Sequence, residues 1–470
     1  MSWLKTTVEI INYLFFGYMM VYAVFLFLSA LVGALELEKR ARNRTFRSSS
    51  HAKQENMPPV SILVPAYNEE ITLLDTVQSL SKLDYGEYEI IVIDDGSTDQ
   101  TAQLLIETYQ LIKVDRPIRR QVASSYGEKV YESINRKAKI VLICKANGGK
   151  ADALNVGINV SRYPYFMTID GDTILQKDTL RNLIRPFMED DRVIACGGMV
   201  QIANEATIHD GQLMNVRSPK NLLAMMQSIE YGRSFLGSRI LFNAFYGNLI
   251  ISGACGLFNK SMVIAVGGYN TQCIGEDMEL VMNLHAFCRS HGKNYKIAYE
   301  PEAICWSQAP ESIKGIHSQR TRWHTGLLQS LYAYRNILFN YRYGMIGWLS
   351  TLYYLFMEAL SPLIEMLGFL NIILATYLSL LDVQFMVRYF FLFVGFSALV
   401  SVTTYFTRIY ALPVRLTLGQ IIKILVFSLA ECLGFRQLIT LFRIEAIINF
   451  RPNRQKSWGK IERQAHNRAA

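Results

Sequence analysis

The chain has two long apolar regions, separated by a central region in which apolar and polar residues alternate in short runs. The first apolar region, residues 10–35, carries no charge and is long enough to cross a bilayer with some tilt. It is too long for the core of a signal peptide, and no small-residue cleavage site follows it. A basic cluster follows instead: Lys39, Arg40, Arg42, Arg44 and Arg47. The positive-inside rule therefore predicts an external N-terminus and a cytosolic chain from residue 40 onward.

The second apolar region covers residues 344–450. Within it, residues 389–407 are uncharged and predict a membrane span. Residues 347–381 are longer and contain Glu358, Pro362 and Glu365. Charges at that depth normally face protein or a watery cavity, so we expect the two glutamates and the surrounding aromatic residues to line a channel.

Residues 420–441 are apolar but hold Lys423, Glu431 and Arg436, so this segment could span the membrane, re-enter it or lie on its surface. The tail, residues 451–470, is basic and is expected in the cytosol. A cytosolic start and a cytosolic end require an even number of crossings. We therefore expect the last apolar segment to turn back.

The central region predicts an α/β domain. Short β-branched and aromatic runs predict strands at residues 60–65, 89–93, 140–144 and 165–169. Helices are expected between them, from Asn68 to residue 83, after a Ser97 or Thr98 cap to residue 112, and over residues 151–160. This alternation predicts a mostly parallel sheet covered on both faces, whose ligands bind beyond the carboxyl ends of the strands.

Composition agrees with a membrane-bound protein: hydrophobic residues make up 51% of the chain, and the mean hydropathy is +0.15. The net charge of +9 is concentrated beside the apolar segments, where anionic lipid headgroups are the expected partner. No basic stripe interleaves with aromatic residues in the central region, so no nucleic-acid partner is expected. The seven cysteines form no CxxC pair and predict buried, reduced thiols of a cytosolic domain.

A metal site is predicted where the fourth strand ends in Asp170, Gly171 and Asp172. Two carboxylates separated by a glycine form a hard-oxygen site for a divalent cation, because the glycine lets the backbone turn so that both reach one ion. Such an ion would stabilise a diphosphate leaving group. An isolated Asp-Gly pair is also ordinary turn chemistry, so the other strand ends decide between the two interpretations.

Two of those ends carry groups that suit a nucleotide. Asp94 and Asp95 close the second strand and are acceptors for a ribose or a uracil N–H. After the third strand, Gly148, Gly149 and Lys150 offer backbone amides, a helix N-terminus and a cation to a phosphate. Together with the metal site these groups would bind one nucleoside diphosphate. The alternative is three unrelated strand-end turns.

Two later motifs predict acceptor chemistry. Glu276 and Asp277 begin a helix, where acidic residues are favourable on their own account; for Asp277 we prefer a general base. Gln319, Arg322 and Trp323 share one helix face at spacings of three and four residues. There the indole can stack on a sugar ring and the arginine can neutralise a diphosphate. A membrane-surface helix is the alternative interpretation of this segment, and both can hold together.

Taken in order, these motifs resemble those of the family 2 processive glycosyltransferases, the group of cellulose, hyaluronan, chitin and poly-N-acetylglucosamine synthases. The resemblance covers about residues 58–326 and is most specific at QRTRW, residues 319–323, which is similar to the family's QxxRW signature. DDGSTD at 94–99, DGD at 170–172 and GED at 275–277 match three further motifs. The resemblance implies a GT-A type, mostly parallel nucleotide-sugar domain between an N-terminal membrane helix and a C-terminal helical membrane region.

The resemblance also implies roles for individual residues. Asp94, Asp95, Tyr67 and Lys150 would contact the nucleotide, and Asp170 and Asp172 would bind Mg²⁺ or Mn²⁺ with the diphosphate. Asp277 would be the base. Gln319 and Arg322 would lie at the donor, and Trp323, Cys255 and Glu276 would lie at the acceptor.

The function expected from this set is an inverting, metal-dependent transferase that extends a β-linked polysaccharide from a UDP-sugar and extrudes it across the cell membrane. We favour UDP-glucose and a cellulose-like or mixed-linkage β-glucan, with poly-N-acetylglucosamine or a hyaluronan-type polymer from UDP-N-acetylglucosamine as the alternative. Two rivals are a transferase that adds a single sugar to a lipid and a scaffold that merely retains the fold. Expected partners are the donor, the growing polysaccharide, the bilayer, and accessory export or regulatory subunits.

The expected organisation has five parts: a membrane helix with its basic flank (1–50), a cytosolic transferase domain (51–310), amphipathic interface helices (311–343), a channel region (344–450) and a basic tail (451–470). We expect only one span before the transferase domain, whereas several synthases have more, and we expect no regulatory cyclic-dinucleotide domain after it. The tail, with Trp458, either anchors on lipid headgroups or folds back against the transferase domain.

Overall fold

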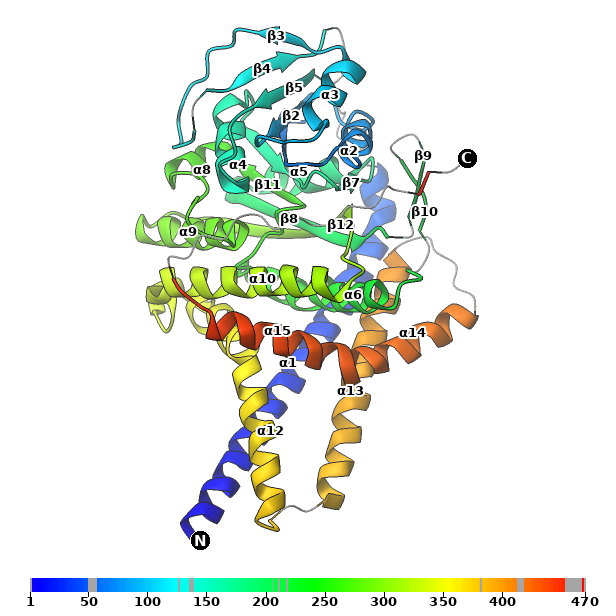
Figure 1. Cartoon of the computed structure of the whole chain (residues 1–470), viewed down its shortest axis with the longest axis vertical. Helices are drawn as coiled ribbons and strands as arrows, with labels where there is room; N and C mark the ends of the chain where they lie inside the picture. The colour runs from blue at the N-terminus through cyan, green and yellow to red at the C-terminus, as the bar shows by residue number, and fades with distance from the viewer. Residues whose placement is uncertain are drawn as a thin grey trace.

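The structure is a computed structural model that describes the chain except for residues 1, 50–56, 126, 135–138, 205, 210–211, 217–218, 381–382, 412–417, 453–466 and 469–470. In Figure 1 a sheet domain lies at the top, a layer of nearly horizontal helices lies beneath it, and further helices extend below that layer. The N-terminus lies at the far end of the extending helices. The chain therefore has a sheet part and a helical part, as the distribution of apolar residues predicts.

Four parallel strands form the centre of the sheet in the order β5 (Lys139–Cys144), β2 (Tyr88–Asp94), β1 (Val60–Ala66) and β6 (Tyr165–Thr168). Every residue of β1 and β2 is buried. Strands covered on both faces read as continuous apolar runs, and this is why the sequence predicts these four strands within a residue or two.

Both flanks of the sheet contain antiparallel pairings, which the sequence does not predict, although β8 and β12 pair in parallel. On one side β11 (Gly256–Asn259) runs antiparallel to both β6 and β8 (Val193–Ile202), followed by β12 (Lys296–Ser307) and β7 (Ile174–Leu175). On the other side β4 (Lys129–Glu132) and β3 (Ile112–Val114) complete a ten-stranded mixed sheet. A separate small sheet joins β9 (Ala206–His209), β10 (Gln212–Val216) and β13 (Asn467–Arg468). The end of the tail thus pairs with β9, whereas Trp458 lies outside the described residues.

Helices cover both faces of the sheet: α2 (Leu73–Leu80), α3 (Thr101–Tyr109), α4 (Lys150–Val160), α5 (Thr179–Glu189), α8 (Lys260–Ala265) and α9 (Glu276–Ser290). Two predicted helix starts are wrong. Asn68 does not open α2, because its backbone is left-handed with φ of 56° and its side chain accepts a hydrogen bond from the Thr98 N–H. Ser97 and Thr98 do not cap α3, since Asp99 accepts the Thr101 N–H at 3.0 Å instead.

A second layer lies between the sheet and the extending helices. It contains α6 (Leu222–Arg233), the π-helical turn η2 (Ser234–Ser238), α7 (Arg239–Asn243) and α10 (Ile313–Ala333). Beneath it lies a broken helix made of α14 (Leu418–Ala430), η7 (Glu431–Phe435) and α15 (Arg436–Ile448). α10 packs on both α9 and α15, so the QRTRW segment joins the sheet domain to the last apolar segment.

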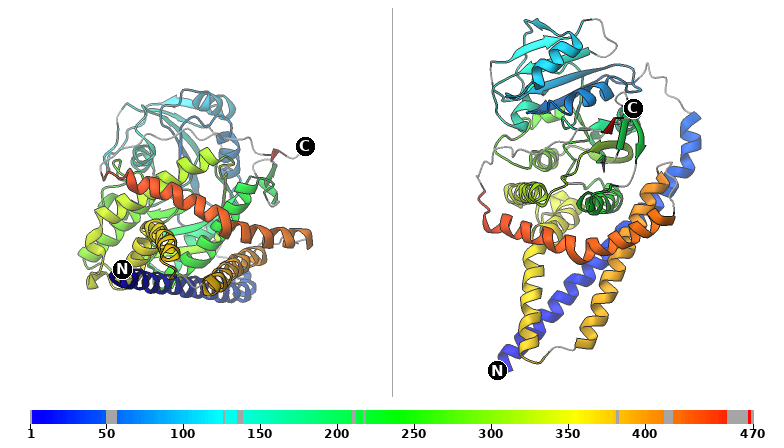
Figure 2. Two further views of the ribbon diagram at one scale, coloured as in Figure 1. Left: turned by 60° about the horizontal axis from the view of Figure 1, so that its bottom comes forward. Right: turned by 45° about the vertical axis from the view of Figure 1, so that its right-hand side comes forward.

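Three helices extend away from these layers: α1 (Ser2–Ser49), α12 (Ser361–Tyr377) and α13 (Val383–Ala411) (Figures 1 and 2). Among the described residues, two helices, residues 3–40 and 421–448, are long and apolar enough to cross a membrane, or three if the pair 346–359 and 361–377, bent by 50°, is one span. Pro362 stands in the first turn of α12, where its missing N–H costs no hydrogen bond. α14 to α15 lie across α12 and α13 in both figures, which favours the surface interpretation of residues 420–441.

Candidate active site

A cavity of about 1380 Å³ opens at the carboxyl ends of the central strands. Most of the residues predicted from sequence line it: Tyr67, Lys150, Asp170, Asp172, Glu276, Asp277, Gln319, Arg322 and Trp323. They come from the ends of β1 and β6 and from the starts of α4 and α9, together with one face of α10. The fold therefore brings together side chains that are more than 250 residues apart in the chain.

The DGD turn directly follows β6. The hydroxyl of Thr76 donates to the Gly171 carbonyl at 2.9 Å and fixes the turn against α2. Asp172 is buried, whereas Asp170 is half-buried and accepts a hydrogen bond from Lys150 at 2.6 Å. A Cβ at Gly171 would lie 3.3 Å from the Glu69 side chain, which explains why the residue between the aspartates is small.

The donor set fits a hexacoordinate cation that is completed by a ligand. Among the described residues, no three His, Cys, Asp or Glu side chains form a metal cluster. Mg²⁺ is typically held by only one or two carboxylates, with substrate phosphates and water filling the remaining positions. Asp170 and Asp172 supply that number of carboxylates on the wall of an open cavity.

Lys150 forms an ion pair with this turn. Its ammonium lies 2.6 Å from Asp170 and 3.3 Å from Glu276. Burial opposes its charge, but the two carboxylates outweigh burial and raise the pKa of Lys150 above its ordinary value. The side chain therefore stays protonated at neutral pH and offers a fixed positive charge to a phosphate.

Asp277 lies in the first turn of α9. Its carboxylate accepts hydrogen bonds from the Met278 N–H at 2.8 Å and the Gly253 N–H at 3.4 Å. Burial, with a further contribution from Glu276 and opposed by Lys150, raises the pKa of Asp277 from 3.8 to about 6. A carboxylate with a pKa near the working pH is suited to general-base catalysis, since it is ionised yet basic enough to take a proton.

A contact between two glycines holds α10 against the start of α9. A Cβ on Gly326 would lie 2.6 Å from the Gly275 Cα, and a Cβ on Gly275 would lie 2.8 Å from the Gly326 Cα. No side chain fits between the two backbones, so Trp323 on α10 is held close to Asp277 on α9. Gly326 is three residues beyond the QRTRW motif, and this close approach is not predicted from the sequence.

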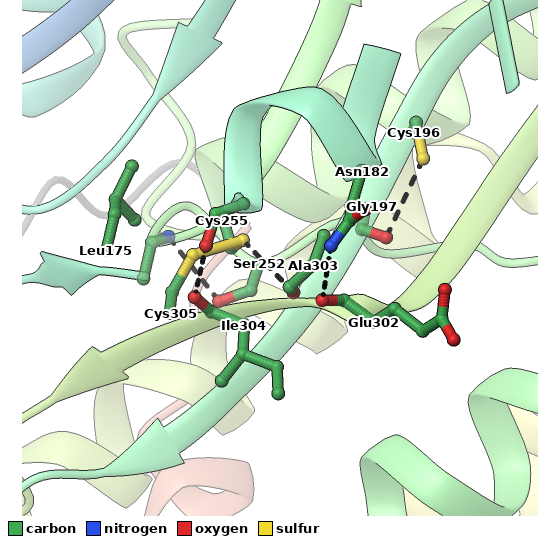
Figure 3. The surroundings of a disulfide bond; sticks show 12 residues. Leu175, Asn182, Cys196, Gly197, Ser252, Cys255, Glu302, Ala303, Ile304 and Cys305 are labelled. Atoms are coloured by element: carbon green, nitrogen blue, oxygen red, sulfur yellow. Dashed lines mark hydrogen bonds between the residues drawn. A yellow bond between two sulfur atoms is a disulfide. The ribbon is translucent and has the colours of Figure 1, made fainter. Parts of the chain in front are cut away.

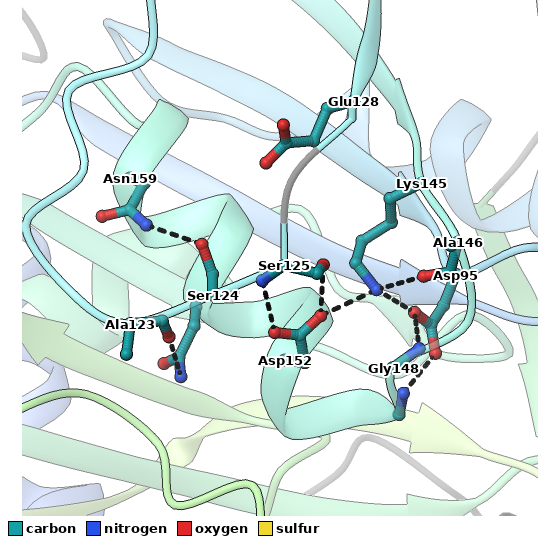
Figure 4. A network of polar contacts seen from close by, with 12 residues as sticks. Asp95, Ala123, Ser124, Ser125, Glu128, Lys145, Ala146, Gly148, Asp152 and Asn159 are labelled. Carbon is teal, nitrogen blue, oxygen red and sulfur yellow. Dashed lines mark hydrogen bonds and ion pairs between the residues drawn. The ribbon is translucent and has the colours of Figure 1, made fainter.

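Asp94 and Asp95 are buried and, within the described part of the chain, are not among the residues that line the cavity. Asp95 forms an ion pair with Lys145 and accepts the N–H groups of Gly148 at 2.9 Å and Gly149 at 2.7 Å (Figure 4). Lys145 also pairs with Asp152 at 2.8 Å. Asp95 therefore shapes the glycine loop in this structure, and a direct contact with uridine stays a prediction.

Cys255 departs from two expectations. It is bonded to Cys305 with a Cα–Cα distance of 6.2 Å, so these two cysteines are not reduced thiols (Figure 3). Its side chain is fully buried between the strands and does not line the cavity, whereas Ser252, Gly253 and Ala254 do. The reason is that Cys255 directly precedes β11, where its side chain faces β12 instead of an acceptor. The other five cysteines are free, as expected.

The cavity continues among the extending helices. Glu358 and Glu365, predicted to line a channel, lie on its wall; Glu358 accepts the Tyr353 hydroxyl at 2.9 Å, and Glu365 accepts the Thr440 hydroxyl at 2.9 Å. One face of α1 also lines the cavity, with the aromatic residues Phe15, Tyr18, Tyr22 and Phe25. A single space thus joins the carboxylate site to the helices expected in the membrane.

Sequence reasoning missed the contribution of α6. Glu230, Tyr231 and Arg233 line the cavity beside Trp323, and Arg233 pairs with the buried Glu431 at 3.0 Å. The only local signal is the presence of charged residues within an otherwise apolar stretch, and their partners lie far away in the chain.

The mixed sheet with a nucleotide-type site at its strand ends defines a GT-A glycosyltransferase fold. The fold is shared with a solved mannosyltransferase, PcManGT from Pyrobaculum calidifontis in complex with GDP-Man and Mn²⁺, with a TM-score of 0.51 and 16% identity over 95% of this chain and 98% of that one. Residues 61–267 match the family model described as glycosyl transferase family 2, and residues 165–419 match glycosyl transferase family group 2. The chain therefore belongs to the family 2 glycosyltransferases, as its motifs predict.

Similar curated proteins are named poly-beta-1,6-N-acetyl-D-glucosamine synthases. One from Staphylococcus epidermidis is 31% identical over 315 residues, and one from Staphylococcus aureus (strain COL) is 30% identical over 314 residues. Each match covers 66% of this chain and 65% of the relative, so the chain spans just under two thirds of their length. These relatives do not support the favoured prediction of a β-glucan from UDP-glucose, and they fit the N-acetylglucosamine alternative better.

Proposed function

We propose that this protein is a membrane-bound processive glycosyltransferase that polymerises N-acetylglucosamine from UDP-N-acetylglucosamine into a β-linked chain. The observation that carries the proposal is the continuous cavity, which contains the carboxylates and Trp323 and extends between α1 and α12. An enzyme that adds one sugar has no need of such an extension, whereas a growing polymer must leave the site. The choice of donor is supported by the names of the relatives.

Donor binding is assigned to the strand-end groups. Asp170 and Asp172 would hold a divalent cation, Mg²⁺ or Mn²⁺, which supplies charge neutralisation to the diphosphate when it is bound. Lys150 and Arg322 add cationic side chains on the same cavity wall, and Tyr67 offers a ring and a hydroxyl to the nucleoside. The Mn²⁺ and GDP-Man in the structurally similar mannosyltransferase support a metal-dependent nucleotide-sugar site.

Transfer is assigned to Asp277 and Trp323. With a pKa of about 6, Asp277 is mostly ionised at neutral pH and can accept the proton of the acceptor hydroxyl as that oxygen attacks the anomeric carbon of the donor. Trp323 is 42% exposed, and its ring offers an apolar face to the acceptor sugar. Gln319 lies one turn before Trp323 on α10 and lines the same cavity.

The orientation in the membrane follows from the charges. The basic residues that follow the apolar part of α1 favour a cytosolic sheet domain, so UDP-sugar would enter from the cytosol. α1, α12 and α13 would cross the bilayer, and the polymer would pass along the aromatic residues and carboxylates of the cavity. The accessory subunits expected from the family resemblance remain a prediction.

The test uses the purified full-length protein in detergent with UDP-N-acetylglucosamine or UDP-glucose and with Mg²⁺ or Mn²⁺. We expect a polymer from UDP-N-acetylglucosamine that β-N-acetylhexosaminidase degrades, with linkages assigned by methylation analysis. A polymer from UDP-glucose alone would overturn the choice of donor. A product carrying a single sugar on lipid would overturn processive synthesis.

A further inference from the structure

An ion pair between Arg320, within the QRTRW segment, and Glu230, outside every recognised motif, lies beside Trp323. Arg320 on α10 donates to both carboxylate oxygens of Glu230 on α6, at 2.9 and 2.7 Å. The two side chains are 4% and 18% exposed, and both residues line the cavity. A bidentate arginine–carboxylate pair fixes both the position and the plane of the guanidinium group. The pair therefore sets one orientation of Arg320.

Arg320 in turn packs against the indole of Trp323 and limits the orientations that the ring can adopt. Its guanidinium carbon lies 4.7 Å from the centre of the Trp323 ring, three residues further along the same helix. Tyr231, the neighbour of Glu230, approaches the ring from α6 with a centroid distance of 6.3 Å. Trp323 still remains 42% exposed, so the ring is supported by two neighbours and open to the cavity elsewhere.

We propose that Glu230 is a positioning residue for the acceptor sugar: it holds Arg320 against Trp323 and thereby orients the indole on which the sugar rests. The inference rests on the proposed function, in which Trp323 contacts the acceptor. Glu230 is 90 residues away from Arg320 in the chain and belongs to none of the motifs that define the site. Removing its charge frees a long arginine side chain and leaves the indole without a fixed support.

The test compares acceptor and donor kinetics in the full-length protein, provided that the wild type forms polymer. Glu230→Gln keeps the size of the side chain but removes the charge. We expect kcat/KM for a soluble oligosaccharide acceptor to fall about 10- to 100-fold, the cost typical of a misplaced reactant. The donor KM and the slow hydrolysis of UDP-sugar without acceptor should stay within about twofold, since the metal carboxylates and Lys150 are untouched. Arg320→Lys keeps the positive charge but cannot form the bidentate pair with Glu230. It should therefore lower kcat/KM for the acceptor to the same extent.

Two controls separate positioning from folding. Glu132→Gln removes a carboxylate of similar burial, 15% exposed, at the far edge of the sheet, where Glu132 pairs with Arg116 at 2.9 Å and also with Lys139 and Arg162. It should leave the acceptor kinetics unchanged. In a Trp323→Phe background, Glu230→Gln should lower the acceptor kcat/KM much less than it does in the wild type, because both changes act through the same ring.

The outcomes are distinct. An unchanged acceptor kcat/KM in Glu230→Gln and Arg320→Lys would overturn the inference. So would an equal loss in donor hydrolysis and transfer, or full additivity with Trp323→Phe. If Glu230→Gln is not recovered from the membrane, Arg320→Lys decides alone. A wild type that forms no polymer from any UDP-sugar would instead overturn the proposed function.

Discussion

Replacing Asp277 by asparagine is expected to abolish synthesis while making the protein more stable. Loss of a general base typically costs about 10²- to 10⁴-fold in rate. The ionised carboxylate also destabilises the folded state, since burial and Glu276 raise its pKa from 3.8 to about 6. That rise corresponds to roughly 3 kcal/mol of lost stability when the group is ionised. Asparagine removes the charge but loses one backbone hydrogen bond worth about 1 kcal/mol, so we expect a net gain of roughly 1–2 kcal/mol.

The sign of the pH dependence follows from the raised pKa. Between pH 3.8 and about 6 the folded state binds more protons at Asp277 than the unfolded state, so this group lowers stability as the pH rises. Above about pH 6 the cost is complete. The stabilising effect of Asp277→Asn should thus be full at pH 7.5 and fade towards pH 4. In the wild type, kcat/KM should fall below about pH 6 as the base is protonated.

The assay pairs polymer synthesis with thermal unfolding in detergent at several pH values. The variant should bind UDP-sugar nearly normally, lose polymer synthesis, and unfold at a higher Tm at pH 7.5, by roughly 1 °C for each kcal/mol gained by a chain of 470 residues. Loss of donor binding would reassign Asp277 to the nucleotide. A lower Tm at pH 7.5 would refute the argument that the carboxylate is held at an energetic cost.

Three further predictions test other parts of the site. Asp172→Asn should abolish turnover and weaken Mn²⁺-dependent UDP binding measured by calorimetry with the fold intact; full activity, or an active wild type in excess chelator, would contradict the metal site. Gly326→Ala should lower kcat by at least about tenfold by pushing α10 off Gly275, with Gly17→Ala, whose Cβ meets nothing within 4 Å, as the neutral control. Peptide mapping without reductant should recover Cys255 linked to Cys305, and reduction should lower the Tm, since closing a 50-residue loop contributes up to about 4 kcal/mol; recovery of both as free thiols would refute the pairing.

Local patterns in the sequence account for the centre of the fold. β1 and β2 are buried along their whole length, so their apolar runs identify them without further information. By contrast, β3 forms the sheet edge and β4 lies next to it; most of their residues are exposed or half-buried, and their short sequences resemble loops. Edge strands are defined by their pairing partners, which a local pattern does not reveal.

The residues of the site, too, were predictable where a local pattern places them and not where a distant partner determines their role. Asp170, Lys150 and Asp277 were predictable because strand ends and helix starts converge in any parallel α/β sheet. Asp95 was predicted to face a ligand. Instead, its carboxylate forms an ion pair with Lys145, 50 residues further along the chain. Glu230 was missed for the corresponding reason. Its chemistry depends on a partner from another helix, and no sequence spacing encodes that contact.

Polymer translocation in proteoliposomes tests whether the protein both synthesises the polysaccharide and exports it. Vesicles carrying the protein with its sheet domain outward would receive external radiolabelled UDP-N-acetylglucosamine and Mn²⁺ or Mg²⁺. We expect a long polymer inside the vesicles, protected from added β-N-acetylhexosaminidase until detergent is supplied. A polymer that stays outside and is digested at once, or a label confined to single sugars on lipid, would contradict a synthase whose product leaves through the cavity between α1 and α12.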